Sequence, residues 1–258
     1  MSVTIKTEEE INILREGGRI LAGILNRVAS AARQDVLADD LDKMAFRLIA
    51  EAGASPSFLG YRTENSSKPF PSSLCVSIND EVVHGISNSI SKKIFDGDIV
   101  GLDLGIKYKG LFTDMAVTVP IGRVDKVGLR LIEMTKAALE VGINAATPGR
   151  RVEVIGKAIT EFVKPSGFSI VEVLSGHGVG YKVHEDPHVP NYVSGSRGPV
   201  LKAGMVLAIE PMLNEGNKDV VLSSDSFTYK TKDGKRSAHF EHTIVITPSG
   251  PEVITASV

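Results

Sequence analysis

Apolar residues recur at helical spacing in four stretches of the chain, two near the N-terminus and two near its middle. The first stretch begins at Thr7 and Glu10, whose spacing is that of a capping box, and it predicts a helix that extends to about Ala32. A second helix is predicted over 39–53, with a glycine at its end. Two further amphipathic helices, separated by a Thr-Pro-Gly sequence, are predicted over 124–146 and 152–164.

Short apolar runs between and after the helix pairs predict strands. Besides the hairpin described below, these runs cover 74–78, 81–84, 205–210 and 240–246, and residues 54–73 are predicted to form a loop. The order helix pair, strands, helix pair, strands predicts two α/β halves of similar plan, although no sequence repeat relates them. No low-complexity linker separates the halves, so we expect one domain, 1–258, with a shared sheet.

Asp103 and Asp114 lie in neighbouring β-branched and apolar runs that predict a β-hairpin. If the turn centres on Tyr108 and Lys109, the two aspartates face each other directly across the two strands. Like charges in such a cross-strand pair are destabilising, so a cation is expected between them. A turn of another length would shift the register and leave one aspartate facing solvent.

Two glutamates and one histidine extend this acidic pair. Glu210 ends an apolar run before a proline, and Glu241 lies within another apolar run. Either glutamate alone is more simply explained by an ion pair with lysine or arginine, since buried charges are paired or bind metal. His177 is flanked by glycines, which would let a substrate or ion approach the backbone, although a lone histidine in such a segment is usually a loop hydrogen bonder.

Composition and charge add bounds on class and location. The chain is 42% apolar and 23% charged, with a formal net charge of -2, and this gives no global signal for nucleic acid or membrane binding. One cysteine, Cys75, excludes an intrachain disulfide framework and a cysteine-rich zinc module. The polar, acidic N-terminus and the lack of long apolar runs predict neither a signal peptide nor a membrane span, so we expect a cytoplasmic protein.

Two aspartates, two glutamates and a histidine form an oxygen-rich donor set that suits a pair of divalent cations. Carboxylates can bridge two metals about 3.5 to 4 Å apart, and such a pair activates a bridging water and stabilises the developing oxyanion. The set therefore predicts metal-assisted hydrolysis. His84 and His184 are left as hydrogen-bond donors or proton-transfer groups beside the metals.

Seven segments of the chain resemble, in order, those of the bacterial type I methionine aminopeptidases, members of the pita-bread fold family. They are distributed over nearly the full length and comprise 77–86, 98–103, 113–114, 175–180, 183–187, 209–212 and 237–242. The resemblance implies an α/β (α+β) fold with pseudo-twofold halves. In that fold a curved, mainly antiparallel sheet is flanked by two helix pairs.

The resemblance also implies the chemistry. Removal of the initiator methionine from nascent proteins is expected when the second residue is small and uncharged. His84 would contact the substrate near the scissile amide, His184 would stabilise the transition state, and Glu210 or another site carboxylate would handle protons. Two metals are implied, and their ligands are Asp103, Asp114, His177, Glu210 and Glu241. Asp114 and Glu241 are the implied bridging ligands. Cobalt, manganese, iron, zinc and nickel all stay open as the metal.

A pocket for the methionine side chain is implied by the same resemblance. Its lining is apolar and contains sulfur, as suits a thioether, and it comprises Phe58, Tyr61, Phe70, Cys75 and Phe227. Core packing explains any one of these residues equally well.

Several departures from the family pattern bear on substrate range. Phe112, Thr113 and Met115 surround the second aspartate where the family usually has other residues, and the phrase 105–115 is closer to proline-specific peptidases of the same fold. His239 stands where the family commonly has glutamine. Phe227 replaces a frequent tryptophan, and 62–67 resembles an insertion near the pocket mouth.

Alternatives of two classes remain: an Xaa-Pro or other aminopeptidase of the same fold, and a noncatalytic binding relative that has lost turnover. The expected partners are the N-termini of nascent polypeptides, with the ribosome left open as a second partner. We expect a monomer that binds no specific nucleic acid and no membrane.

Overall fold

The computed structural model describes residues 3–62, 68–88 and 91–256. Among these residues the long helices are α1 (Glu8–Ala31), α2 (Ala38–Glu51), α3 (Lys126–Ala145) and α4 (Glu153–Val163), and the last is followed by the 3-10 turn η1 (Lys164–Ser166). The four predicted helices are therefore confirmed to within a few residues at each end. None of the helices within the described ranges is long and apolar enough to cross a membrane.

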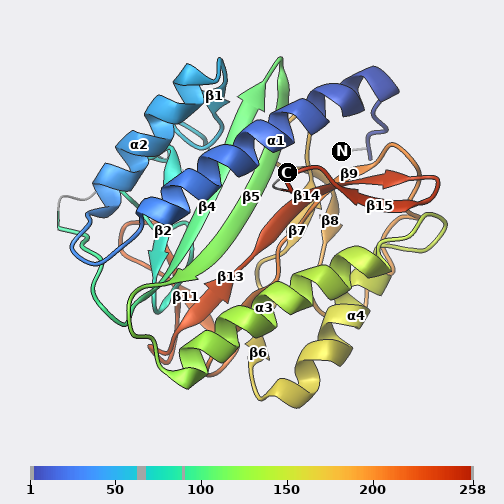
Figure 1. Cartoon of the computed structure of the whole chain (residues 1–258). Coiled ribbons are helices and arrows are strands. Elements are labelled where there is room, and N and C mark those ends of the chain that lie inside the picture. Colours follow the sequence, from blue (N-terminus) through green and yellow to red (C-terminus); the bar gives the residue numbers. More distant parts are fainter. Residues whose placement is uncertain (1–2, 63–67, 89–90, 257–258) are drawn as a thin grey trace.

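A curved antiparallel sheet forms the centre of the molecule (Figure 1). Its main path runs β1-β4-β5-β14-β9-β7-β8, with β2 paired to β4 and β15 paired to β14. These strands are β1 (Ser55–Pro56), β2 (Leu74–Ile78), β4 (Ile99–Tyr108), β5 (Leu111–Pro120), β7 (Gly176–Gly178), β8 (Glu185–Val189), β9 (Val206–Ile209), β14 (Glu241–Thr247) and β15 (Gly250–Val253).

Two small sheets complete the described strands. One has the order β13-β10-β6 and the other β11-β12-β3. Their strands are β3 (Glu81–Val83), β6 (Ser169–Ile170), β10 (Met212–Asn214), β11 (Val220–Leu222), β12 (Tyr229–Thr231) and β13 (Ser237–His239). The two-residue strand β1, in a stretch predicted to be loop, pairs with the end of β4.

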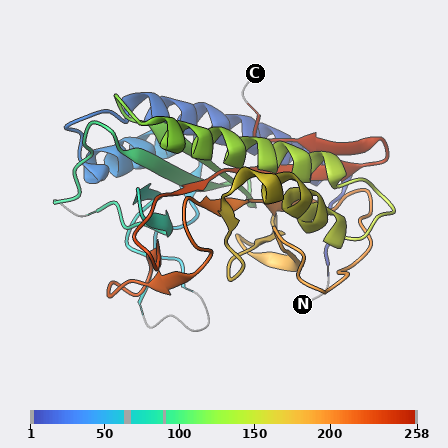
Figure 2. The ribbon, with the colours of Figure 1, turned by 90° about the horizontal axis from the view of Figure 1, so that it is seen from below.

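Both helix pairs cover the same face of the central sheet, as the two views show (Figures 1 and 2). One apolar core joins α1 and α2 to β2, β4 and β5, and a second joins α3 and α4 to β9 and β14. Leu102, Leu104 and Ile106 of β4 lie in the first core, fully buried. Because side chains alternate along a strand, Asp103 and Gly105 must point to the opposite face of the sheet.

The hairpin prediction is confirmed, but its predicted register is wrong. Gly105 pairs with Asp114 and Asp103 pairs with Ala116, so the two aspartates are diagonal neighbours rather than a direct pair. The reason is the turn, whose central residues are Lys109 (φ 46°) and Gly110 (φ 91°). Two left-handed residues are the signature of a two-residue hairpin turn, and glycine adopts that conformation readily. The shift is by two positions, so both carboxylates stay on one face of the sheet.

Candidate metal centre

The predicted metal-binding residues lie on or directly after five consecutive strands of the central sheet. Asp103 is on β4, Asp114 on β5, Glu241 at the start of β14 and His177 on β7, while Glu210 directly follows β9. The strand register aligns them in two adjacent rows on the face away from the helices. One row contains Asp103 and Glu241, each of which pairs with Ala116. The other row contains Asp114, which pairs with Gly105, and His177, which pairs with Ala208.

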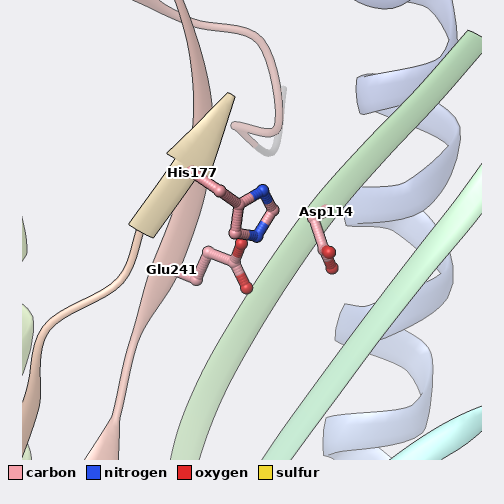
Figure 3. A group of neighbouring side chains, drawn as sticks. All are labelled: Asp114, His177 and Glu241. Atoms are coloured by element: carbon pink, nitrogen blue, oxygen red, sulfur yellow. The ribbon is translucent and has the colours of Figure 1, made fainter. Parts of the chain in front are cut away.

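Three of these side chains converge closely (Figure 3). One donor atom from each of Asp114, His177 and Glu241 lies within 4.8 Å of the others. Glu210 joins them, because its Oε1 is 3.3 Å from Nε2 of His177. Asp103 lines the same cavity, where burial raises its pKa and the nearby Asp114 charge raises it further.

Hydrogen bonding fixes the tautomer of His177. Its Nδ1 is 2.9 Å from the carbonyl oxygen of Gly178, and because a carbonyl only accepts, Nδ1 carries the proton. Nε2 is then an unprotonated acceptor that faces the Glu210 carboxylate. Two acceptors, Nε2 of His177 and Oε1 of Glu210, need a cation or a proton between them at this distance. A neutral imidazole whose other nitrogen donates to a carbonyl is the usual form of a histidine metal ligand.

The carboxylates are too deeply buried to be ionised together without a cation. Burial raises the pKa of Asp114 to about 7 and raises the pKa of Glu241 well above its ordinary range, with the Asp114 and Glu210 charges adding to the second shift. Burial, with Asp103 and Asp114 as the neighbouring charges, also raises the pKa of Glu210. Protons would therefore be held here at neutral pH unless a divalent ion displaced them.

Unpartnered atoms and an open space indicate that a metal fits the site. Asp103 Oδ1 and Glu241 Oε1 are buried, and neither makes a hydrogen bond to another described residue. Both residues line an open cavity. Gly105, opposite Asp114, allows close packing beside it, because a Cβ there would lie 2.1 Å from Ser57 Oγ and 3.2 Å from Asp114 Oδ1. Four carboxylates and one imidazole form a donor set that suits divalent cations such as manganese, iron, cobalt or zinc.

The glycines beside His177 have a different role from the predicted one. A Cβ on Gly176 would lie 2.3 Å from the Ala208 carbonyl oxygen, and one on Gly178 would lie 2.2 Å from that of Asp186. These glycines therefore allow the neighbouring backbone segments to approach β7 closely. They position His177 between its neighbours, and the expectation that they admit a ligand to the backbone is wrong.

A cavity of about 520 Å³ adjoins the donor cluster. All five residues predicted for the methionine pocket line it, namely Phe58, Tyr61, Phe70, Cys75 and Phe227. They also form one apolar cluster, in which Phe70 and Phe227 meet edge to face with ring centroids 5.4 Å apart. The cluster contains three residues that sequence reasoning missed, Ile86, Phe112 and Val183. The position of Val183 directly before His184 was the available signal.

His84 and His184 lie on the cavity wall together with the carboxylates. His184 Nδ1 is 2.7 Å from the hydroxyl of Tyr61, and its ring centroid is 4.4 Å from that of His177. His84 adopts a left-handed backbone conformation, φ 58°, which is uncommon outside glycine and often marks functional sites. The structure therefore brings every predicted site residue to one cavity.

The departures from the family pattern have different environments. Thr113 is buried, and its hydroxyl has no partner among the described residues. His239 is buried behind Glu210, with Nε2 3.8 Å from Glu210 Oε2. Tyr61 and Lys68, on each side of the predicted insertion, both line the cavity. Residues 63–67 of that insertion lie outside the described residues.

Known proteins resemble this chain over its whole length. The model of metallopeptidase family M24 matches residues 12–248. A methionine aminopeptidase of Clostridium perfringens is 42% identical over 253 residues, which cover 98% of each chain. The structure of a methionine aminopeptidase from Thermotoga maritima superimposes with a TM-score of 0.94 at 39% identity, covering 99% of this chain and 100% of that one.

A more distant structure separates fold from specificity. Prolidase from Pyrococcus furiosus superimposes with a TM-score of 0.77 at 24% identity, covering 98% of this chain and 66% of that one, so this likeness concerns the fold alone. The mixed helix and strand architecture and the pita-bread fold are thereby confirmed. With the family match and the close relatives together, this chain belongs to metallopeptidase family M24.

Proposed function

We propose that this protein is a metal-dependent aminopeptidase that removes N-terminal methionine from nascent polypeptides. One observation carries the proposal: the buried carboxylate and histidine cluster opens directly into an apolar cavity of about 520 Å³ whose wall includes a cysteine and several aromatic rings. The cluster supplies hydrolytic chemistry, and the cavity supplies a site for one unbranched apolar side chain. Methionine aminopeptidases that cover almost the whole chain support the choice of residue.

The proposed ligands are the five residues that the central sheet aligns, with Asp114 and Glu241 shared between two divalent ions. When bound, the ions would polarise the scissile carbonyl and lower the pKa of the attacking water. Unpartnered oxygens on Asp103 and Glu241 support this assignment, since buried acceptors without donors are ready to bind a cation. The full set is Asp103, Asp114, His177, Glu210 and Glu241.

The remaining site residues position substrate and move protons. Glu210 lines the cavity, with Oε1 3.3 Å from Nε2 of His177, and we assign this carboxylate to accept a proton from water and return it to the leaving amine. His84 is held in a left-handed backbone conformation at the cavity wall, and we assign it the contact near the scissile amide. His184, whose Nδ1 is bound by Tyr61, has Nε2 available to stabilise the transition state.

Selection for methionine is assigned to the apolar cluster around Phe58, Phe70 and Phe227. Its aromatic faces and the thiol of Cys75 suit a polarisable thioether, which packs favourably against both. A charged side chain would be desolvated there without compensation.

The cellular setting completes the proposal. We assign residues 1–258 to one catalytic domain, because a continuous sheet joins the two helix pairs. We propose a monomer in the cytoplasm that acts on the N-termini of nascent polypeptides as they emerge from the ribosome.

Peptide cleavage tests the function. Metal-stripped enzyme is resupplied with Mn(II), Co(II), Fe(II) or Zn(II) and offered Met-Ala-Ser, Met-Lys-Ser and Ala-Pro-Ser. Release of methionine from Met-Ala-Ser alone, and only with metal, is the expected result. Cleavage of the prolyl peptide alone would assign the chain to the Xaa-Pro peptidases. No turnover with any metal, in protein that binds the ions, would favour a noncatalytic binding role.

A further inference from the structure

His239 is a buried histidine to which the proposed mechanism gives no role. It is the last residue of β13 and is 4% exposed. Its Nε2 makes no hydrogen bond to any of the described residues. A buried polar atom without a partner costs about 1–3 kcal/mol, so this nitrogen requires an explanation.

The nearest group of opposite character is the carboxylate of Glu210. Oε2 of Glu210 is 3.8 Å from Nε2 of His239, while Oε1 is 3.3 Å from Nε2 of His177. Two imidazoles therefore flank the carboxylate, one at each oxygen. Nε2 of His177 carries a lone pair, as its bond to the Gly178 carbonyl requires. A second lone pair facing Glu210 would be repulsive, so the favoured tautomer of His239 has its proton on Nε2.

The backbone around His239 fixes the position of its ring. The hydroxyl of Thr118 donates to the His239 carbonyl oxygen at 2.7 Å and accepts from the His239 N–H at 2.9 Å. His239 also pairs across the small sheet with Met212, two residues after Glu210. Strand β5 on one side and β10 on the other therefore hold the imidazole beside the carboxylate.

We propose that His239 is a positioning residue of the metal centre. Its Nε2 faces Glu210 Oε2 at 3.8 Å, and its N–H would donate to that oxygen when a bound ion draws Oε1 into the donor cluster. The inference rests on the proposed assignment of Glu210 as a metal ligand. It does not depend on which peptide is cleaved. Groups that orient a ligating carboxylate typically contribute about 10–100-fold to metal affinity.

Two substitutions separate a hydrogen-bonding role from a packing role. His239→Leu keeps much of the side-chain volume but has no N–H, whereas His239→Gln retains an amide N–H that can reach an acceptor. His242→Ala is the matched control. His242 is on the next strand, β14, one residue after Glu241, but its Nδ1 bonds the hydroxyl of Thr255 instead.

Metal affinity is the primary readout. Chelator-treated proteins are titrated with Mn(II) and with Co(II) by calorimetry, and folding is checked by circular dichroism and thermal melting. We expect His239→Leu to weaken the affinity by about 10–100-fold and His239→Gln to stay within about threefold of the parent. The control should bind as the parent does. Unchanged affinity in folded His239→Leu would overturn the inference, as would a His239→Gln protein that loses as much affinity as the leucine variant.

A double-mutant cycle tests whether His239 acts through Glu210. In a Glu210→Ala background, His239→Leu should change metal affinity by less than about twofold, because the partner of the N–H is already absent. An undiminished effect in that background would contradict the inference. These titrations contain no peptide, so their result does not depend on the proposed methionine specificity. The peptide cleavage experiment tests that specificity separately.

Discussion

The proposed metal centre and the apolar pocket line one cavity, but the chain builds them in different ways. The proposed ligands lie on or directly after five neighbouring strands of one sheet, and strand register sets their relative positions. The aromatic wall comes mainly from loops: Phe58, Tyr61 and Phe70 precede β2, and Phe227 lies between β11 and β12. Positions on a sheet are rigid, whereas loops tolerate substitution and insertion. This fold therefore places the proposed metal ligands on or beside the strands of the sheet and most of the proposed side-chain pocket in loops.

Loss of a carboxylate that is proposed to bridge the metals should have the largest effect. Asp114→Ala or Glu241→Ala removes a buried carboxylate from the donor cluster, so turnover should fall by at least about 10³-fold, or about 4 kcal/mol in the barrier. The second metal should be lost as well. Kinetics with Met-Ala-Ser and metal analysis of the purified variants test this. Near-normal activity in either folded variant would refute the assigned site.

Loss of a cavity histidine should affect catalysis without removing metal. His184→Ala should lower kcat by about 10²–10⁴-fold, the range typical of a residue that assists proton transfer or stabilises charge. The metal content should stay that of the parent, because this histidine is proposed to contact substrate. Stopped assays for free methionine and elemental analysis measure the two quantities. A variant that loses metal in step with activity would place His184 among the ligands instead.

Truncation of a pocket side chain should lower kcat/KM for methionyl peptides without changing metal affinity. Phe227→Ala removes one aromatic wall, and the loss of apolar contact should lower kcat/KM for methionyl peptides by roughly 10–200-fold. Metal affinity should not change, since the phenyl ring packs on Phe70. Steady-state kinetics with Met-Ala-Ser and with a norleucyl analogue provide the comparison. An equal loss of metal affinity would mean that loop and sheet are not separate parts.

The smallest expected effect is on the stability of the metal-free protein. Burial raises the pKa of Asp114 to about 7, so the folded chain holds a proton that the unfolded chain releases above about pH 4. The contribution of Asp114 to stability should therefore fall as pH rises from about 4 through 7. With chelator, the melting temperature at pH 8 should lie at least about 3 °C below that at pH 5.5.

Added Mn(II) should raise the melting temperature at pH 8 above that at pH 5.5, because the ion replaces the protons on the carboxylates. In chelator, the neutral side chain of Asp114→Asn should flatten the pH dependence relative to the parent. Melting curves across pH 5 to 8 provide the measurement. A chelated protein that becomes more stable with rising pH would contradict the upward direction of the carboxylate pKa shifts.

Strand patterning was sufficient to predict in outline the cluster of carboxylates that the structure brings together. Four carboxylates within apolar runs are unusual, and their number alone indicates a cation. The predicted hairpin register was wrong because the register depends on the turn. Lys109 adopts a positive φ there, although lysine lacks the conformational freedom of glycine. Local sequence does not predict that conformation for lysine.

Loop residues were harder to assign from the residues alone. Phe58 and Phe227 are 169 positions apart in the numbering, and an aromatic residue in a loop is equally well explained by core packing. Only the family resemblance grouped them. His239 was visible as a departure, but its position beside Glu210 arises from the pairing of β10 with β13, which no spacing in the sequence predicts.

A crystal structure with bound manganese would be the decisive test of the proposed metal centre. Crystals grown with Mn(II) and free methionine would be measured at a wavelength where manganese scatters anomalously. We expect anomalous peaks within about 2.0–2.2 Å of carboxylate oxygens from Asp114 and Glu241, with the methionine side chain against Phe70 and Phe227. Manganese bound elsewhere, with Asp114 and Glu241 free of metal, would contradict the proposed site.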